Sequence, residues 1–179
     1  MAQVKPTYQK KESKTIFSDE KIELGWMDTS KTVKRTVRVA WDERYHKLLE
    51  AKVTVSAKPS SDRNYFDAYL DGNNIIHLSW DIGDTASKTG SKDVTDSIRN
   101  GDNIFECSFS KFNWWPTGVS VTFTEILDLT WEVQEGVEPP KPPEQTKGGL
   151  TNTEWIAIGV GVGGAALGAA ALLRREKKK

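Results

Sequence analysis

Residues 119–133 read VSVTFTEILDLTWEV, and this stretch decides the fold because its apolar side chains recur at every second position. A first set runs from Val119 to Phe123, and a second set runs from Leu127 to Val133. Successive side chains of a β-strand point to opposite faces, so a period of two is typical of a strand with one buried and one solvated face. The stretch therefore predicts two short strands.

The same alternation recurs upstream, between short clusters of Gly, Asn, Asp and Ser. The dipeptide Asp71-Gly72 between two of these sets is a favoured two-residue hairpin turn. Seven or eight short strands at this spacing predict an all-β fold, an antiparallel jelly-roll-like β-sandwich. The upstream sets are Val33, Val37, Val39 and Trp41; Ala51, Val53, Val55 and Ala57; Phe66, Ala68 and Leu70; Ile76, Leu78 and Trp80; and Phe105, Cys107 and Phe109.

One stretch within the predicted sandwich carries a family resemblance. Residues 92–109 read KDVTDSIRNGDNIFECSF, and residues 69–81 before them read YLDGNNIIHLSWD. Over residues 32–134 the chain resembles galactose-binding-like jelly-roll domains, which implies that fold. Asp93 and Thr95 can also hydrogen-bond nearby backbone, as a tight turn into the next strand requires. The matching residues are Asp71-Gly72, Asp93-Val94-Thr95, Ile98, Gly101 and Asn103-Ile104.

The chain divides into five segments of different composition. The arm is polar and lysine-rich, and only Lys21–Trp26 has the character of a short strand. The linker holds four prolines, and proline-rich chain is extended at about 3.1 Å per residue, so we expect a stalk. The predicted segments are an N-terminal arm (1–31), the β-sandwich (32–134), a Pro-rich linker (135–154), a transmembrane helix (155–173) and a basic tail (174–179).

The predicted helix, WIAIGVGVGGAALGAAALL, contains no charged residue. A helix of this length spans roughly 28 Å, close to the hydrocarbon thickness of a bilayer. Trp155 is expected at one membrane interface, and Arg174 and Arg175 at the other. Small residues let helix backbones approach closely, so we predict association with a partner helix or a second copy. The residues of this packing face are Gly159, Gly163, Gly164 and Gly168.

Two signals give opposite predictions for the side of the membrane on which the domain lies. Residues 1–17 contain no apolar run of the signal-peptide type, and a C-terminal anchor alone leaves a domain in the cytosol. Positively charged flanks tend to stay in the cytosol, so the basic tail predicts a cytosolic C-terminus. The domain then lies at the cell-envelope exterior or on a virion membrane. Both predictions stay open.

Charge and cysteine content limit the possible classes of function and the compartments in which the domain can lie. Residues 1–150 carry 20 basic and 23 acidic side chains, and this negative balance argues against nucleic-acid binding by the domain. The single cysteine, Cys107, excludes an intramolecular disulfide. This fits a reducing compartment, or an outside-facing domain large enough to fold without disulfides.

An aromatic loop is the candidate binding site. Phe112, Trp114 and Trp115 lie beside Pro116 and Gly118, after an alternating set. Sugar-binding sandwiches present aromatic faces from such loops, and a glycan is one predicted ligand. Alternatively, the aromatic side chains cap the core, and this is the favoured interpretation. A third interpretation is that they anchor a protein contact.

Catalytic and metal-binding patterns are weak. His46 and His77 have no neighbours at metal-ligand spacing, and Cys107 lies on an apolar strand face, as an inert core thiol does. We therefore predict no enzyme and no cofactor. Some jelly rolls of the resembling family hold calcium, and the residues considered for such a structural site are Asp81, Asp84 and Asp93.

The sequence predicts a non-enzymatic, single-pass membrane protein with a displayed β-sandwich. Two functions stay open, and the missing leader, the absence of disulfides and the Gly-rich anchor favour the second of them. One is a binding module for a glycan or another surface ligand. The other is a structural subunit of a virion or cell envelope that links a capsid or lattice to a membrane.

Overall fold

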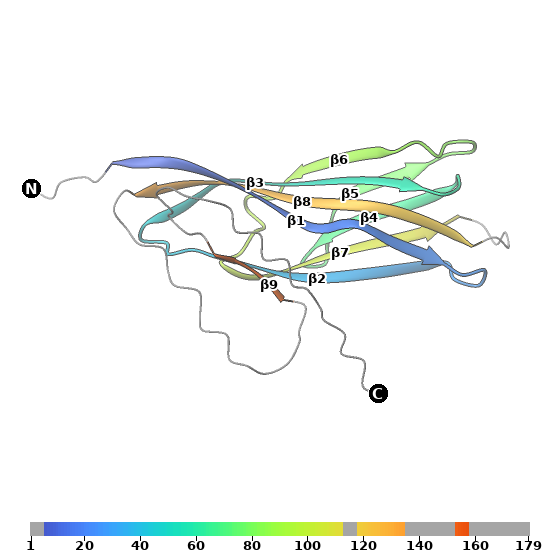
Figure 1. Cartoon of the computed structure of the whole chain (residues 1–179), viewed down its shortest axis with the longest axis horizontal. Coiled ribbons are helices and arrows are strands. Elements are labelled where there is room, and N and C mark those ends of the chain that lie inside the picture. Colours follow the sequence, from blue (N-terminus) through green and yellow to red (C-terminus); the bar gives the residue numbers. More distant parts are fainter. Residues whose placement is uncertain (1–5, 113–117, 135–152, 158–179) are drawn as a thin grey trace, which may run out of the picture.

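The computed structural model describes residues 6–112, 118–134 and 153–157, the last of these as backbone only. The described chain is all-β (Figure 1). Its strands are β1 (Thr7–Leu24), β2 (Ser30–Ala40), β3 (His46–Pro59), β4 (Asn64–Leu70), β5 (Asn73–Trp80), β6 (Lys88–Asp93), β7 (Gly101–Lys111), β8 (Val119–Gln134) and β9 (Thr153–Ala157).

The strands form two sheets packed face to face. One sheet has the order β1-β8-β3-β6 and the other β5-β4-β7-β2-β9. All pairs among β1 to β8 are antiparallel. These eight strands alternate between the sheets except at the β4–β5 hairpin, which is the strand order of a jelly roll. The predicted antiparallel β-sandwich is confirmed, while the galactose-binding-like resemblance stays a prediction.

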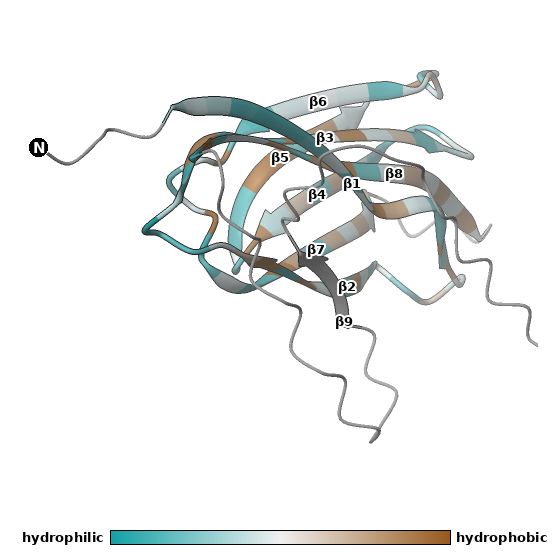
Figure 2. Ribbon diagram, turned by 60° about the vertical axis from the view of Figure 1, so that its left-hand side comes forward, coloured by the Kyte–Doolittle hydropathy of each residue, from teal (hydrophilic) through white to brown (hydrophobic). Residues whose placement is uncertain are grey.

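The core lies between the sheets and comes from the alternating positions. Hydrophobic and hydrophilic positions alternate along the strands in Figure 2. Phe123 of β8 joins the two sheets, because its ring centroid lies 4.9 Å from that of Phe66 on β4 and 5.3 Å from that of Phe17 on β1. Burial of such side chains is the main driving force for folding.

Strand β8 differs from the prediction of two short strands. It is one strand of 16 residues, and Glu125 occupies the inward position between the two apolar sets. The register shows Glu125 opposite Phe17 on β1 and Val55 on β3. In the sequence, Glu125 interrupts the apolar alternation and therefore suggests the end of a strand. In the structure, β1 and β3 pair with β8 on both sides of Glu125, so β8 continues through this position.

The predicted N-terminal arm is also different in the structure, because Thr7–Leu24 forms β1 and pairs with β8 along its length. The first half of β1 is mostly polar on both faces, so the period of two is hidden there. A bulge brings the adjacent residues Ile16 and Phe17 into the core together. The sandwich therefore begins at Thr7 rather than at Thr32.

The β4–β5 hairpin has the predicted turn. Asp71 and Gly72 have φ of 49° and 82°, as a type I′ turn requires. A regular register from this two-residue turn would place the inward Phe66 opposite the outward His77. The bulge between Ala68 and Tyr69 shifts the register by one residue, so Phe66 faces the inward Leu78 instead. The buried faces of β4 and β5 therefore match.

The motif region from Asp93 to Asn103 forms the connection that enters β7. The Asp93 carboxylate accepts hydrogen bonds from the Thr95 amide (2.9 Å) and the Thr95 hydroxyl (2.7 Å), as predicted. The buried Asn103 side chain accepts from the Arg99 amide and donates to the carbonyls of Arg99 and Gly101. These bonds hold the turn ahead of β7.

The C-terminal segment is described only in part. Thr153–Ala157 forms β9, which pairs in parallel with Thr36–Ala40 of β2. The predicted transmembrane helix begins at Trp155, but Trp155–Ala157 belongs to β9, so the helix does not start where the sequence predicts it. Residues 135–152 and 158–179 lie outside the described residues, so the stalk, the rest of the helix and the basic tail stay predictions. Within the described ranges, no helix has the length and apolar character needed to cross a membrane.

Candidate functional site

Four connections between strands meet at one end of the sandwich, which we call the loop end. Leu24 pairs with Val119 across β1 and β8. Asn64 pairs with both Trp80 and Lys111, which brings the ends of β4, β5 and β7 together. The ends of β1 and β7 lie together at the right of Figure 1. The loop end consists of the described residues 25–29, 60–63 and 81–87 together with 112 and 118, and residues 113–117 of the fourth connection lie outside the described residues.

The loop end carries the most exposed large hydrophobic side chains of the described residues. Trp26 is 68 %, Met27 76 %, Ile82 75 % and Phe112 65 % exposed. The other two such residues, Leu49 and Ile104, are only 36 % and 41 % exposed and lie on strands. Single exposed hydrophobic residues are ordinary, whereas several on neighbouring loops mark an interaction surface.

Hydrogen bonds between the connections fix the backbone of the loop end. The Lys111 ammonium donates to the carbonyls of Gly25 (3.0 Å) and Trp26 (3.1 Å). The Phe112 amide donates to the Arg63 carbonyl at 3.0 Å. The Gly83 amide donates to the Asp62 carboxylate at 2.6 Å, so the third and second connections are joined as well.

A hollow of about 410 Å³ opens beside Phe112. Its volume falls within the range of small-ligand pockets. The Tyr65 and Phe112 rings meet edge to face with their centroids 6.1 Å apart, and the Trp80 indole is held by its hydrogen bond to the Ala86 carbonyl. The residues lining the hollow are Arg63, Tyr65, Trp80, Asp81, Ile82 and Phe112.

The backbone at Arg63 is in the left-handed region, with φ of 56°. This conformation is unfavourable for a residue with a side chain and needs support from its surroundings. Asn64 supplies it, because its buried amide donates to the carbonyls of Ser61 (2.6 Å) and Asp62 (2.9 Å). The wall of the hollow is therefore fixed before any ligand arrives.

The loop end is acidic: its connections contain four aspartates and a single basic residue, Arg63. Three of the aspartates are used within the structure. Asp28 accepts from the Gly25 amide, Asp62 from the Gly83 amide, and Asp84 pairs with Lys88, which lowers the pKa of the Asp84 carboxyl.

The fourth aspartate, Asp81, is different. It is exposed at the edge of the hollow, and within the described residues its carboxylate makes no hydrogen bond or ion pair. A fixed hollow with one unused carboxylate can bind an apolar group that has a cationic or hydrogen-bond-donating neighbour.

The predicted aromatic loop begins at the loop end, but only its first aromatic residue is described. Phe112 is exposed and lines the hollow, so this side chain does not cap the core. Trp114 and Trp115 lie outside the described residues. The predicted packing glycines of the helix and Arg174 and Arg175 also lie outside them, and Trp155 is described as backbone only.

Cys107 lies in the core, as expected from its strand position, and it contacts Glu125. The thiol lies 3.4 Å from the Glu125 carboxylate, and the second carboxylate oxygen has no partner in the described structure. Burial raises the pKa of Glu125 to about 8, and the hydrogen bond from Cys107 opposes this shift. Burial and the neighbouring carboxyl raise the pKa of Cys107, so no reactive thiolate forms there.

The structure also brings together a pair that the sequence reasoning missed. Asp67 accepts hydrogen bonds from His77 and Asn74, each at 2.8 Å, on the outer face of the β4–β5 hairpin. The His77 ring stacks on Tyr65 with centroids 5.8 Å apart. The pairing depends on the bulge in this hairpin, because a regular register would place Asp67 opposite Ile76.

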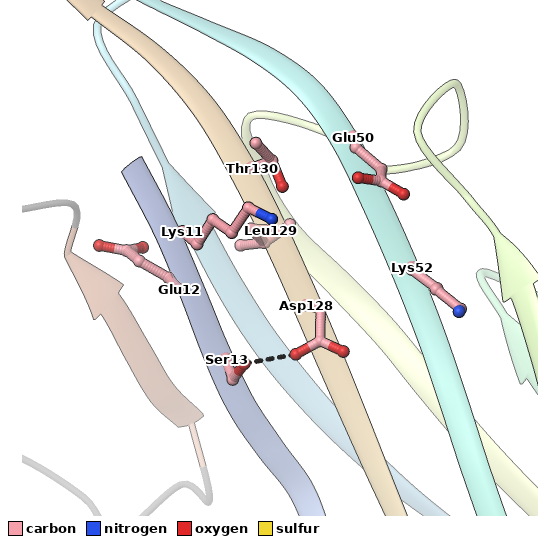
Figure 3. A pocket seen from close by; sticks show the side chains of 8 residues that line it. All are labelled: Lys11, Glu12, Ser13, Glu50, Lys52, Asp128, Leu129 and Thr130. Carbon is pink, nitrogen blue, oxygen red and sulfur yellow. Dashed lines mark hydrogen bonds between the residues drawn. The ribbon is translucent and has the colours of Figure 1, made fainter. Parts of the chain in front are cut away.

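A second, polar hollow of about 230 Å³ crosses the outer face of β1, β8 and β3 (Figure 3). Ser13 donates a hydrogen bond to Asp128 across β1 and β8. Lys11 and Lys52 line it together with Glu50, Asp128 and Glu12, and Glu12 forms an ion pair with Lys10, so charges of both signs lie close together on this surface.

The aspartates considered for calcium are not brought together. Asp81 and Asp84 lie in the β5–β6 connection at the loop end, whereas Asp93 ends β6 at the opposite end of the sandwich. Among the described residues, no group of three His, Cys, Asp or Glu side chains has metal-binding geometry. A structural calcium ion stays an expectation from the resemblance alone.

Comparison with known proteins gives likenesses of structure alone. No protein-family model and no curated protein matches the sequence. The infectious bursal disease virus Gx strain structure has 14 % identity and a TM-score of 0.46, and covers 72 % of this chain and 33 % of that chain. The VP2 subviral particle of the same virus has 12 % identity and a TM-score of 0.42, covering 70 % and 37 %.

A family two carbohydrate esterase from Cellvibrio japonicus has 11 % identity and a TM-score of 0.29, covering 74 % of this chain and 37 % of that chain. This chain thus spans about a third of the length of the viral structures. All these TM-scores lie below 0.5, so these likenesses assign no function to this chain.

Proposed function

We propose that the chain is a non-enzymatic binding module whose recognition surface is the loop end. The observation that carries the proposal is the gathering of Trp26, Met27, Ile82 and Phe112 on three connections at one end. Trp, Met and Phe are enriched in the buried centres of protein interfaces. Hydrogen bonds within the loop end reduce the conformational entropy lost on binding.

The direction of the chain supports this use of the loop end. β8 begins at the loop end, so Gln134 lies at the opposite end of the sandwich. β9 runs parallel to β2, so Ala157 lies beside Ala40, also away from the loop end. The part of the predicted anchor that follows Ala157, residues 158–173, would leave the loop end pointing away from the membrane attachment.

Two alternatives use the same surface. A glycan is favoured by the aromatic side chains of the hollow, Tyr65 and Phe112, beside the polar Arg63 and Asp81. A structural subunit of a virion or cell envelope would use the loop end as a lattice contact. Both are binding roles, so they share the first test.

Site-specific photo-crosslinking tests the proposal. A photoreactive phenylalanine replaces Ile82 in the full-length chain, produced in its native cells, and the matched control carries the same group at Ile104 on β7. We expect a discrete cross-linked product from position 82 that is absent from position 104. No product from position 82, or the same products from both positions, would contradict a recognition surface at the loop end.

A further inference from the structure

We infer that the partner at the loop end is a protein that inserts one apolar side chain into the hollow and places a lysine or arginine beside Asp81. This inference rests on the proposed function and names the chemistry of the partner. Its basis is the combination of exposed apolar side chains, a preformed hollow and a carboxylate that the described residues leave without a partner.

The apolar side chains favour a protein over a sugar. Met27 and Ile82 have no aromatic face on which a sugar ring can stack, yet they are as exposed as Trp26 and Phe112. Their burial requires an apolar surface of comparable size. Protein interfaces supply such a surface at their centres, with a polar rim around it.

The charges disfavour two other occupants. A membrane surface rich in anionic lipid attracts Lys and Arg, whereas the connections of the loop end hold four aspartates against Arg63. The two lysines at its border are engaged, Lys88 by Asp84 and Lys111 by backbone carbonyls. A second copy that docks with its own loop end would bring like charges together, because a two-fold contact places the same patch on both sides. A partner with basic residues around its apolar patch matches the loop end.

Asp81 gives the inference its specific element. Asp28, Asp62 and Asp84 are engaged by groups of the chain itself, so their carboxylates serve the loops. Asp81 lines the hollow together with Ile82. A cation placed there would form its ion pair next to buried apolar contacts, where solvent screens it less.

A random 12-residue peptide library displayed on phage tests this partner chemistry. The library is selected on the full-length chain in detergent micelles. Each round is counter-selected on the variant Trp26→Ser/Met27→Ser/Ile82→Ser/Phe112→Ser. We expect selected peptides to combine an aromatic or aliphatic residue with Lys or Arg.

The affinity of those peptides is then measured on two single variants. Asp81→Asn should weaken binding about fivefold or more, and the effect should shrink at high salt. The matched control Asp96→Asn removes an exposed carboxylate at the other end of the sandwich and should leave affinity unchanged.

The outcomes separate the inference from the proposed function. Peptides that require the four apolar residues but lack Lys and Arg, or ignore Asp81→Asn, would overturn the partner chemistry and leave the binding surface intact. If no peptide binds the full-length chain better than it binds the quadruple variant, the partner chemistry is overturned as well. The proposed function itself fails only if position 82 also gives no specific cross-link. Binding of glycans or anionic vesicles in place of peptides would replace the protein partner with that class.

Discussion

Two regions of this protein place side chains against the usual rule of apolar inside and polar outside. In the core, β8 places the carboxyl group of Glu125 between the sheets, where Cys107 supplies its one hydrogen bond from the described part of the chain. At the loop end, four large apolar side chains lie in solvent. The two exceptions differ in their physical consequences.

The buried carboxyl group acts on folding, because the unfolded chain leaves it in water and the folded chain does not. The exposed apolar side chains lie in water in both states, so they change the free energy of unfolding little. Their energy becomes available when a partner covers them. The core exception therefore affects stability, and the surface exception affects binding.

The largest expected effect comes from the same substitution in the two environments. Phe123→Ala should lower the free energy of unfolding by about 3–5 kcal/mol, because Phe123 is buried against Phe17 and Phe66. Phe112→Ala should change it by less than about 0.5 kcal/mol. Denaturant unfolding of the full-length chain measures both. Equal losses would show that Phe112 belongs to the core.

The second effect concerns Glu125 and has the opposite sign. Its pKa of about 8 in the folded state lies above the ordinary value of 4.5, so folding at pH 7 must protonate a carboxylate. Glu125→Gln removes this requirement and should raise the free energy of unfolding by about 3 kcal/mol at pH 7.

The pH dependence supplies the control for Glu125. Because the pKa of Glu125 is raised in the folded state, the stabilising contribution of its protonated form is complete below pH 4.5. This contribution is lost as pH rises through about 8. Wild type should therefore lose stability relative to Glu125→Gln over this range and run parallel to it above. A constant difference from pH 4 to pH 9 would mean that Glu125 does not titrate in this way.

A third substitution compares Glu125 with a buried polar group that is well satisfied. Asn103 is fully buried and makes three hydrogen bonds to the backbone of Arg99 and Gly101. Asn103→Ala should lower the free energy of unfolding by about 1–3 kcal/mol. Thermal unfolding gives the sign directly, and a stabilised variant would place Asn103 in the same class as Glu125.

A small effect is also expected when all four exposed apolar side chains are changed at once. The variant Trp26→Ser/Met27→Ser/Ile82→Ser/Phe112→Ser should stay within about 1 kcal/mol of the wild type, since each surface substitution is small. Thermal unfolding followed by circular dichroism checks this. A loss of several kcal/mol would mean that these residues support the fold, and that the comparison between core and loop end does not hold.

Particular residues show how far the sequence predicts this structure. The alternation of Ala51 to Ala57 and of Phe105 to Phe109 predicts strands correctly, because a period of two is a local property of the chain. Asp71-Gly72 predicts its turn for the same reason, as few residues accept positive φ. The first half of β1 is not predicted, because its polar residues carry no period.

The candidate site is less predictable. The aromatic loop predicts Phe112 as a candidate binding residue, although core capping is the favoured interpretation of that loop. In the structure Phe112 is exposed, and its binding role stays a prediction. Trp26, Met27 and Ile82 were missed as a group, since nothing in their local sequence shows that their connections meet. Asp81 was considered for calcium, and its position beside a hollow appears only when the loops are assembled.

The sequence by itself determined the fold class, the inward faces of most strands and the β4–β5 turn, because these follow from side-chain alternation and backbone preference over a few residues. The tertiary structure decided that 119–134 is one strand with Glu125 in the core, that β1 completes a sheet, and that four connections meet at the loop end. The physical reason is that these features depend on pairing between strands far apart in the chain, and local sequence does not specify which strands pair.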